Sequence, residues 1–357
     1  MKRAIAVTAA LLMAGAGSVV TGAAAANAST STAPVWSRVF QSSDTGFFQS
    51  IDPISKSNIL AAASLFSGDN TVYKPYVVRY NGSKWSTVTI PGAAGVSTTR
   101  VQSTSASDVW VFGMTSNKQH ISAYTAFHWN GSTWRRIPVP ALTDLQGTVV
   151  LGPSNVWAFG GSGSMAGDIF HWNGSAWKAY DTNYDFKFIP QSISASSASN
   201  VWIAGVTTGK TPEAVAFRWN GSRWSEASTP HPDVEFGGPG LTVLSPSNVW
   251  IGWDTETAVF AEHWNGRTWT KTTPPDDVNA DGGDIVADGR GGLWWGPFAD
   301  RNGSAWISTL GVSPSYSSGA FGPVASIPGT SSSVMAAGVE NAGSKVEHPT
   351  IYRLTFG

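Results

Sequence analysis

The chain has 357 residues, of which 22 are Lys or Arg, 23 are Asp or Glu, and none is Cys. This near-neutral balance offers no basic field to attract nucleic acid, and the lack of cysteine excludes disulfides and thiolate metal sites. The 18 tryptophans and 39 glycines, with only 13% charged residues, favour a rigid β protein whose stability comes from a large core.

The start of the chain has the three regions of a secretory signal peptide. Lys2 and Arg3 supply a positive charge, an apolar run covers residues 4–20, and small residues follow it. We expect residues 1–28 to be a signal peptide and residues 29–357 to form the mature, secreted, extracellular protein. The apolar run is short and interrupted, which argues against a membrane anchor, and no later run reaches the ~20 residues of a spanning helix.

Six Asn-Gly dipeptides recur along the mature chain, and in each a tryptophan follows four residues after the Asn. The Asn residues are Asn81, Asn130, Asn173, Asn220, Asn265 and Asn302. Successive Asn residues are 49, 43, 47, 45 and 37 residues apart, and a period of this size indicates a repeat architecture. Asn-Gly between two alternating apolar runs predicts a β-hairpin with a type I′ turn, because both central residues of that turn need φ > 0.

A second motif, Ser-x-Asp/Asn-Val-Trp, recurs as a short apolar strand. Clear copies end at Trp110, Trp157, Trp202 and Trp250, and weaker copies end at Leu60, Trp294 and Met335. Each repeat therefore predicts four antiparallel strands: an inner strand, the Val-Trp strand, the strand before Asn-Gly and an outer strand. Four such strands in roughly 45 residues are what one blade of a β-propeller requires.

The two ends of the mature chain complement each other. The chain finishes with the strand 351–354, which has no outer strand after it, and begins with the strand 34–37, which has no strand before it. We therefore predict an all-β fold with a single domain over residues 29–357. It is a seven-bladed β-propeller of four-stranded antiparallel blades, and the N-terminal strand completes the last blade and closes the ring.

The repeats, which read Ser-x-Asp/Asn-Val-Trp and then His-Trp-Asn-Gly-x-x-Trp, resemble those of secreted actinobacterial β-propeller proteins. The resemblance covers essentially the whole mature chain, and a looser similarity extends to kelch-type and lectin propellers. It implies the fold and secretion, and it implies little about activity.

Most of the aromatic and histidine residues belong to the repeat. Sixteen of the 18 tryptophans occupy recurring positions and are interpreted as packing between blades, which leaves Trp253 and Trp295 as candidate ligand residues. His128, His171 and His263 share one position of the repeat with Arg79, Arg218 and Arg353. We expect this His/Arg position to be structural, with a hydrogen bond to the Asp or Asn of the Val-Trp turn.

The turns on one face of such a propeller are short and repetitive, whereas the loops on the opposite face vary widely. Function in repeat proteins tends to lie on the variable face. The candidate ligand-binding residues in or beside these loops are Tyr180, Tyr184, Asp185, Asp254, Glu256, His120 and His348. The loop 180–188 suits a sugar, since aromatic rings stack on sugar faces and carboxylates accept from hydroxyls; alternatively, its phenylalanines cover the edge of the blade.

Acidic and basic residues are also distributed differently between the variable loops and the hairpins. Acidic residues gather in the variable loops, whereas twelve basic residues lie on or beside the outer hairpins, among them Arg38, Arg79, Lys84, Arg135, Arg136 and Arg353. An acidic loop face favours cations or neutral polar ligands over phosphate polymers. The alternative is a solvated surface that keeps the protein soluble.

One variable loop has the pattern of a calcium site. Asp277, Asn279 and Asp281 alternate before Gly282, and Asp288 falls at the twelfth position. No helices are predicted around the loop, so the site would be a calcium loop of the propeller type. The alternative is an ordinary turn stabilised by local side-chain hydrogen bonds. No other cofactor is indicated.

These observations predict a secreted, monomeric, non-catalytic binding propeller that recognises an extracellular glycan or protein on its variable-loop face. The competing hypothesis is a carbohydrate-active enzyme, a glycoside hydrolase or polysaccharide lyase, with a site near the propeller axis. Hydrolysis would require paired carboxylates, and no motif joins the available ones.

Overall fold

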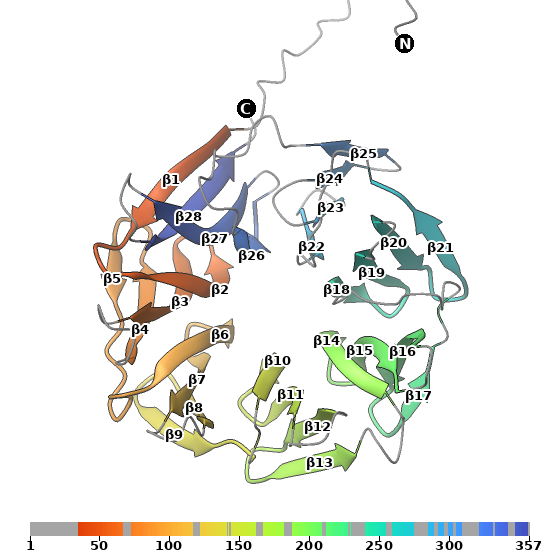
Figure 1. Cartoon of the computed structure of the whole chain (residues 1–357), viewed down its shortest axis with the longest axis horizontal. Helices are drawn as coiled ribbons and strands as arrows, with labels where there is room; N and C mark the ends of the chain where they lie inside the picture. The colour runs from red at the N-terminus through yellow and green to blue at the C-terminus, as the bar shows by residue number, and fades with distance from the viewer. Residues whose placement is uncertain are drawn as a thin grey trace, which may run out of the picture. The chain divides into compact units, whose positions relative to one another are not determined.

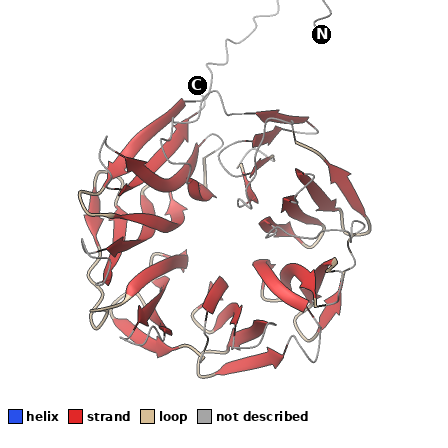
Figure 2. Ribbon diagram, in the orientation of Figure 1, coloured by secondary structure: helices blue, strands red, loops and turns tan. Residues whose placement is uncertain are grey.

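The computed structural model describes residues 35–66, 73–116, 122–140, 142, 144–161, 167–181, 188–208, 212–227, 229, 240–254, 259–274, 285–288, 292–295, 299–302, 305–308, 321–330, 333–341 and 347–355. Residues Ala33–Gly357 form one compact unit. Every regular element described in this unit is a β-strand (Figure 2). No helix that could cross a membrane occurs in the described part of the chain.

The strands form seven four-stranded antiparallel sheets, which we number in chain order (Figure 1). The first sheet contains β2 (Gly46–Ser55), β3 (Asn58–Phe66), β4 (Tyr73–Tyr80) and β5 (Trp85–Thr87). The second contains β6 (Ser97–Ser105), β7 (Asp108–Ser116), β8 (Ser122–Trp129) and β9 (Trp134–Pro138). The third contains β10 (Asp144–Gly152), β11 (Asn155–Gly161), β12 (Gly167–Trp172) and β13 (Trp177–Asp181).

The remaining sheets repeat this plan. The fourth contains β14 (Phe188–Ser197), β15 (Asn200–Thr207), β16 (Ala214–Trp219) and β17 (Trp224–Glu226). The fifth contains β18 (Gly240–Ser245), β19 (Asn248–Asp254), β20 (Val259–Trp264) and β21 (Trp269–Thr272). The sixth contains β22 (Ile285–Ala287), β23 (Leu293–Trp295), β24 (Ala299–Asn302) and β25 (Ala305–Ser308). The seventh contains β26 (Phe321–Ser326), β27 (Ser333–Asn341), β28 (Glu347–Thr355) and β1 (Val35–Gln41).

The contacts between sheets form a closed cycle. The first strand of each sheet contacts the first strand of the next, and β26 of the seventh sheet contacts β2 of the first. Within the seventh sheet, β1 pairs antiparallel with β28, and Trp36 lies opposite Leu354. The prediction of an all-β chain with repeated four-stranded antiparallel sheets is confirmed, and the pairing of β1 with β28 agrees with the predicted closure.

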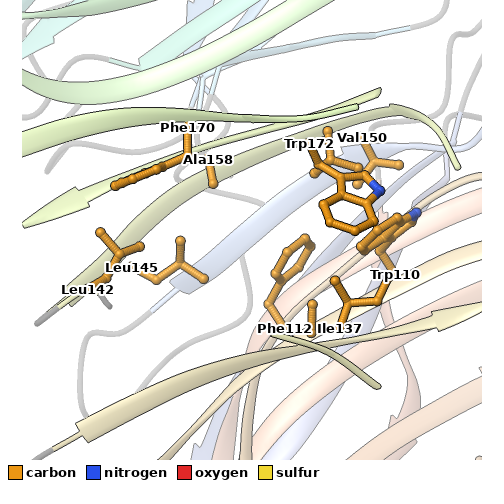
Figure 3. Packing of buried hydrophobic residues seen from close by; sticks show 11 residues of the cluster. Trp110, Phe112, Ile137, Leu142, Leu145, Val150, Ala158, Phe170 and Trp172 are labelled. Carbon is orange, nitrogen blue, oxygen red and sulfur yellow. The ribbon is translucent and has the colours of Figure 1, made fainter. Parts of the chain in front are cut away.

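The core lies between neighbouring sheets rather than inside any one of them. The second strand of each sheet carries the Val-Trp motif, and β15 is buried at almost every position because both of its faces are covered. Between the second and third sheets, Trp110 and Phe112 pack with Val150, Phe170 and Trp172 (Figure 3). Each sheet therefore buries apolar side chains against the neighbours on both sides.

The Asn-Gly hairpins are present, but the predicted type I′ turn is wrong. In the first sheet Tyr80 pairs with Trp85, and the backbone N–H of Asn81 donates to the carbonyl of Lys84. The central residues are thus Gly82, whose φ is +95°, and Ser83. The Asn81 side-chain oxygen accepts the N–H groups of Ser83 and Lys84, both at 3.0 Å, so the asparagine caps the turn from the position before it.

In the first five sheets the glycine of the Asn-Gly turn lies against the serine of the preceding β-turn. A Cβ on Gly131 would come within 2.8 Å of the Ser107 Cβ, and the same approach recurs between Gly174 and Ser154. The two short, repetitive turns of a sheet therefore lie side by side, as the sequence predicted.

We expect Gly131→Ala to lower the free energy of unfolding by about 2 kcal/mol, because the residue has φ +93° and its Cβ would collide with Ser107. Urea unfolding measures this change. Gly92→Ala is the matched control, because Gly92 has φ +76° but nothing within 4 Å of the added Cβ. Equal losses in the two variants would contradict a role for the Ser107 contact.

Candidate functional site

Three of the Val-Trp tryptophans, Trp110, Trp202 and Trp250, donate their indole N–H to the Asp or Asn two residues before them in the same sheet. In the second sheet the Asp108 carboxylate accepts the indole N–H of Trp110 at 3.2 Å and lies 2.8 Å from His128 Nε2. The imidazole of His128 stacks on Trp110 with ring centroids 4.6 Å apart. Asp108 accepts a further hydrogen bond from Thr104. Burial alone would raise the pKa of Asp108, but the hydrogen bonds from His128, Thr104 and Trp110 lower it below its ordinary value.

The same contacts recur with asparagine in place of aspartate. Asn248 accepts from Trp250 at 2.8 Å and lies 3.0 Å from His263 Nε2. In the first sheet the Nε of Arg79 donates to Asn58 at 2.7 Å. The predicted structural role of the His/Arg position, with a hydrogen bond to the Asp or Asn of the Val-Trp turn, is confirmed in these sheets.

The anchored tryptophan fills the interface with the next sheet. There it meets an aromatic pair, formed by the residue before Asn-Gly and the tryptophan after it. Trp157 lies 5.2 Å from Trp219 and 5.3 Å from Trp224, in edge-to-face geometry. Trp202 lies 6.2 and 5.9 Å from the corresponding pair, Trp264 and Trp269.

Two sheets have no tryptophan at this position. In the first sheet Leu60 lies opposite Arg79, as Trp110 lies opposite His128 in the second. In the seventh sheet Met335 takes the same place, opposite Arg353. Since leucine is much smaller than tryptophan, Leu60 fills less of the interface after the first sheet than a tryptophan would.

A pocket lies at each of these two interfaces. The first, of about 290 Å³, lies between the seventh and first sheets, and its lining is Val39, Ile59, Tyr80, Ser83, Trp85 and Arg353. The second, of about 190 Å³, lies between the first and second sheets, and its lining is Ile54, Leu60, Arg79, Val88, Ala106, Val109, Trp129 and Trp134. We call them the Arg353 pocket and the Arg79 pocket.

The two pockets have the same chemical plan. Each has an aromatic pair on one side, Tyr80 with Trp85 or Trp129 with Trp134, whose ring centroids are 5.4 and 5.6 Å apart. These rings are partly exposed. Each pocket is also lined by β-branched or leucine side chains and by an arginine from the preceding sheet. Among the described residues that line the two pockets there is no carboxylate. The arrangement suits a ligand with a flat or apolar body and a group that accepts hydrogen bonds.

The two tryptophans that lie outside the repeat are buried. Trp253 has 0% and Trp295 1% of its surface exposed, so neither ring can line an open ligand site. The indole N–H of Trp253 donates to the carboxylate of Glu262 at 3.0 Å, and Glu262 is itself fully buried. Trp295 packs with Trp250, Ile285 and Leu293. The interpretation of both tryptophans as ligand residues is therefore not supported; they belong to the core.

Three other candidate residues lie in three different sheets. Tyr180 is partly buried between Trp157 and Trp219, with ring centroids 5.7 and 5.9 Å away. His348 Nδ1 lies 3.0 Å from the carbonyl oxygen of Asp44, so this nitrogen donates the hydrogen bond. Asp254 lies at the end of β19. The structure does not bring these three residues together.

Most of the predicted variable-loop site lies outside the described residues, namely His120, Tyr184, Asp185 and Glu256. Of the predicted calcium ligands, Asp277, Asn279 and Asp281 also lie outside them. Asp288 is 1% exposed, and its carboxylate accepts the backbone N–H of Gly292 at 2.7 Å, which stabilises the turn between β22 and β23. Within the described ranges no group of three or more His, Asp or Glu side chains could hold a metal ion.

Sequence reasoning missed both pockets, although a signal for them was present. The weak copies of the Val-Trp motif end in Leu60 and Met335, and these are the positions at which the filling tryptophan is absent. A departure from the repeat, rather than a motif, marked the site.

Comparison with solved structures supports the fold. YCF48 from Cyanidioschyzon merolae is similar with a TM-score of 0.58 and 15% identity, over 90% of this chain and 98% of that one. YCF48 bound to D1 peptide has a TM-score of 0.55 and 13% identity, over 90% and 96%. The SapL1 lectin with alpha methyl fucoside, at 0.47 and 14% over 76% and 98%, scores too low to establish a shared fold. No protein-family model matches this chain, and neither does any curated protein.

Together, the repeated four-stranded antiparallel sheets and these similarities are consistent with a β-propeller. At 13 to 15% identity the similarities concern the fold and not the ligand.

A carboxylate lies between the sheets that flank the Arg79 pocket. Asp52 on β2 lies opposite Leu60 and accepts the hydroxyl hydrogen bond of Ser103 on β6. Burial raises the pKa of Asp52 from 3.8 to about 6, although hydrogen bonds from the side chain and backbone of Ser103 act to lower it. The native state thus holds a proton on Asp52 more tightly than the unfolded chain does.

The contribution of Asp52 to stability is therefore present below pH ~4 and is lost as the pH rises through about 6. We expect Asp52→Asn, which stays neutral, to raise the free energy of unfolding at pH 7 by about 1 kcal/mol and to change it little at pH 4. Urea unfolding of both proteins at the two pH values tests this. A difference between the proteins that is the same at pH 4 and pH 7 would contradict the assignment.

Proposed function

We propose that this protein is a secreted, non-catalytic binding propeller with seven blades that recognises an extracellular glycan. The observation that carries the proposal is the pair of pockets with aromatic walls, the Arg353 pocket and the Arg79 pocket. Indole and phenol rings stack on the faces of sugars, and such a ring pair is partly exposed in each pocket. A stable scaffold that holds small, half-open pockets is what a binding protein requires.

The pockets differ in place from the site that the sequence predicted. Ser83 of the Asn-Gly turn lines one of them, and Ala106 of the turn before Asp108 lines the other. They therefore lie toward the short, repetitive turns rather than toward the variable loops. We accordingly propose these grooves between sheets as ligand sites, and the variable-loop residues remain a prediction.

The enzyme hypothesis gains no support from these pockets. A glycoside hydrolase needs two carboxylates around the scissile bond, and none is present among the described residues of either lining. Arg79 and Arg353 are always protonated and cannot act as a general acid or base at neutral pH.

Secretion rests on the signal-peptide pattern of residues 1–28, and membership of the actinobacterial propeller family rests on the repeat motifs. Sequencing the N-terminus of protein recovered from the culture medium tests secretion. We expect it to begin near Ser29. Protein that keeps Lys2 and Arg3 and stays with the cells would contradict it.

A glycan array probed with the mature chain, residues 29–357, tests the function. We expect binding to a defined set of sugars and weaker binding in Leu60→Trp, which restores the tryptophan of the repeat and fills the Arg79 pocket but leaves the Arg353 pocket open. Thermal unfolding of the variant checks that it is folded. Binding that survives Leu60→Trp in full would exclude the Arg79 pocket as a ligand site, and no binding to any sugar would refute a glycan ligand.

The same array, run with calcium and with a chelator, tests the predicted loop of Asp277, Asn279 and Asp281. Binding that requires calcium would support a metal site there, because the part of each pocket lining that the structure describes has no carboxylate to hold the ion. Binding that is unchanged by the chelator would show that recognition of the sugar does not require calcium.

A further inference from the structure

The arginine in each pocket marks a difference between these two interfaces and the others. Where the Val-Trp tryptophan is present, its ring covers the residue at the His/Arg position. His171 and His263 stack on their tryptophans with centroids 4.3 and 4.1 Å apart. The guanidinium of Arg218 lies over the ring of Trp202, 5.7 Å from its centroid. In the first and seventh sheets Leu60 and Met335, rather than a tryptophan, lie opposite the arginine, and Arg79 and Arg353 line the two pockets.

The Arg79 guanidinium is held in place. Its Nε donates to Asn58 at 2.7 Å, which fixes the plane of the group from the side of its own sheet. The remaining N–H donors of a guanidinium form a planar fork that matches the two oxygens of a carboxylate. An oriented fork loses less rotamer freedom on binding than a mobile side chain would.

The charge around both pockets is positive. Lys84 follows Ser83 in the turn that lines the Arg353 pocket, and Arg135 and Arg136 follow Trp134 of the Arg79 pocket, and all three are exposed. Two carboxylates lie on the strands that line the Arg79 pocket, and both accept hydrogen bonds within the fold: Asp52 accepts from Ser103, and Asp108 accepts from His128, Thr104 and Trp110. A chain with a formal net charge of −1 thus presents a local cationic surface at these grooves.

We propose that each pocket binds one carboxylate-bearing sugar ring of an acidic polysaccharide. The ring lies against the aromatic pair, and its carboxylate accepts hydrogen bonds from Arg79 or Arg353. Volumes of about 190 and 290 Å³ are below or at the lower end of the ~300–1,000 Å³ typical of ligand pockets, which suits a single ring. This inference rests on the proposed glycan-binding function and names its ligand class.

The repetition of the pocket favours a polymer. The two pockets lie on opposite sides of the first sheet, one repeat apart, and present the same aromatic pair and arginine. A polysaccharide with a carboxylate on successive units can occupy both sites, and the second contact then benefits from a high effective concentration. A peptide can also offer several carboxylates, from Asp and Glu side chains and its C-terminus, but none of them is attached to a ring that could lie against the aromatic pair.

The test uses polygalacturonate and its fully methyl-esterified form, which has the same rings without the charge. We expect the mature protein to bind the acid and to bind the ester at least about tenfold more weakly, as measured by calorimetry. Arg79→Met and Arg353→Met should each weaken binding of the acid by about tenfold or more, the cost of losing a charge-assisted hydrogen bond. Arg218→Met is the matched control and should leave binding unchanged, because its arginine lies over Trp202.

The outcomes separate this inference from the proposed function. Equal binding of acid and ester, or binding of the acid that is insensitive to both arginine substitutions, overturns the inference and keeps a glycan ligand. Binding of neutral sugars alone on the array would likewise overturn the inference and keep a glycan ligand. If a peptide with a free C-terminal carboxylate binds at Arg79 and no polysaccharide binds, both the inference and the glycan function are wrong.

Discussion

The arrangement of the sheets depends on one repeated contact, the packing of a Val-Trp tryptophan against the aromatic pair of the next sheet. The indole of Trp110 is fixed at its edge by Asp108 and on its face by His128, so it projects from its own sheet in one orientation. A ring anchored in this way sets both the spacing and the angle of the neighbouring sheet. The polar contacts of the indole thus influence the packing between sheets, because they fix the orientation of this large apolar ring.

Much of the fold could be predicted because the same strand and turn motifs recur several times along the chain. The recurrence of Asn-Gly and Val-Trp established the four-stranded unit, and the shared position of His128 and Arg79 indicated its hydrogen bond. The turn geometry was mispredicted, since Asn-Gly dominates short hairpins but Asn81 acts here through its side chain from outside the central pair. Trp253 was misread because its partner, the buried Glu262, belongs to no motif.

The site was harder to predict than the fold, for a physical reason. A pocket at an interface of repeats arises where a side chain is too small, and a small residue carries no chemical signature of its own. Leu60 alone is an ordinary strand residue. Its significance becomes clear only by comparison with the larger tryptophans at the same position in other sheets. Loops that vary in length attract attention more readily, although variation alone says nothing about shape.

The pairing of β1 with β28 orders the events of folding. His348 on β28 contacts Asp44, just after β1, across 304 residues of chain. Because a chain is made from its N-terminus, β1 is synthesised first and its partner β28 last. The first strand therefore stays unpaired for almost the whole of synthesis. An edge of this kind is open to pairing with other chains. The ring can close only when the last strand arrives, so β1 and β28 pair after the strands of the other six sheets have been made.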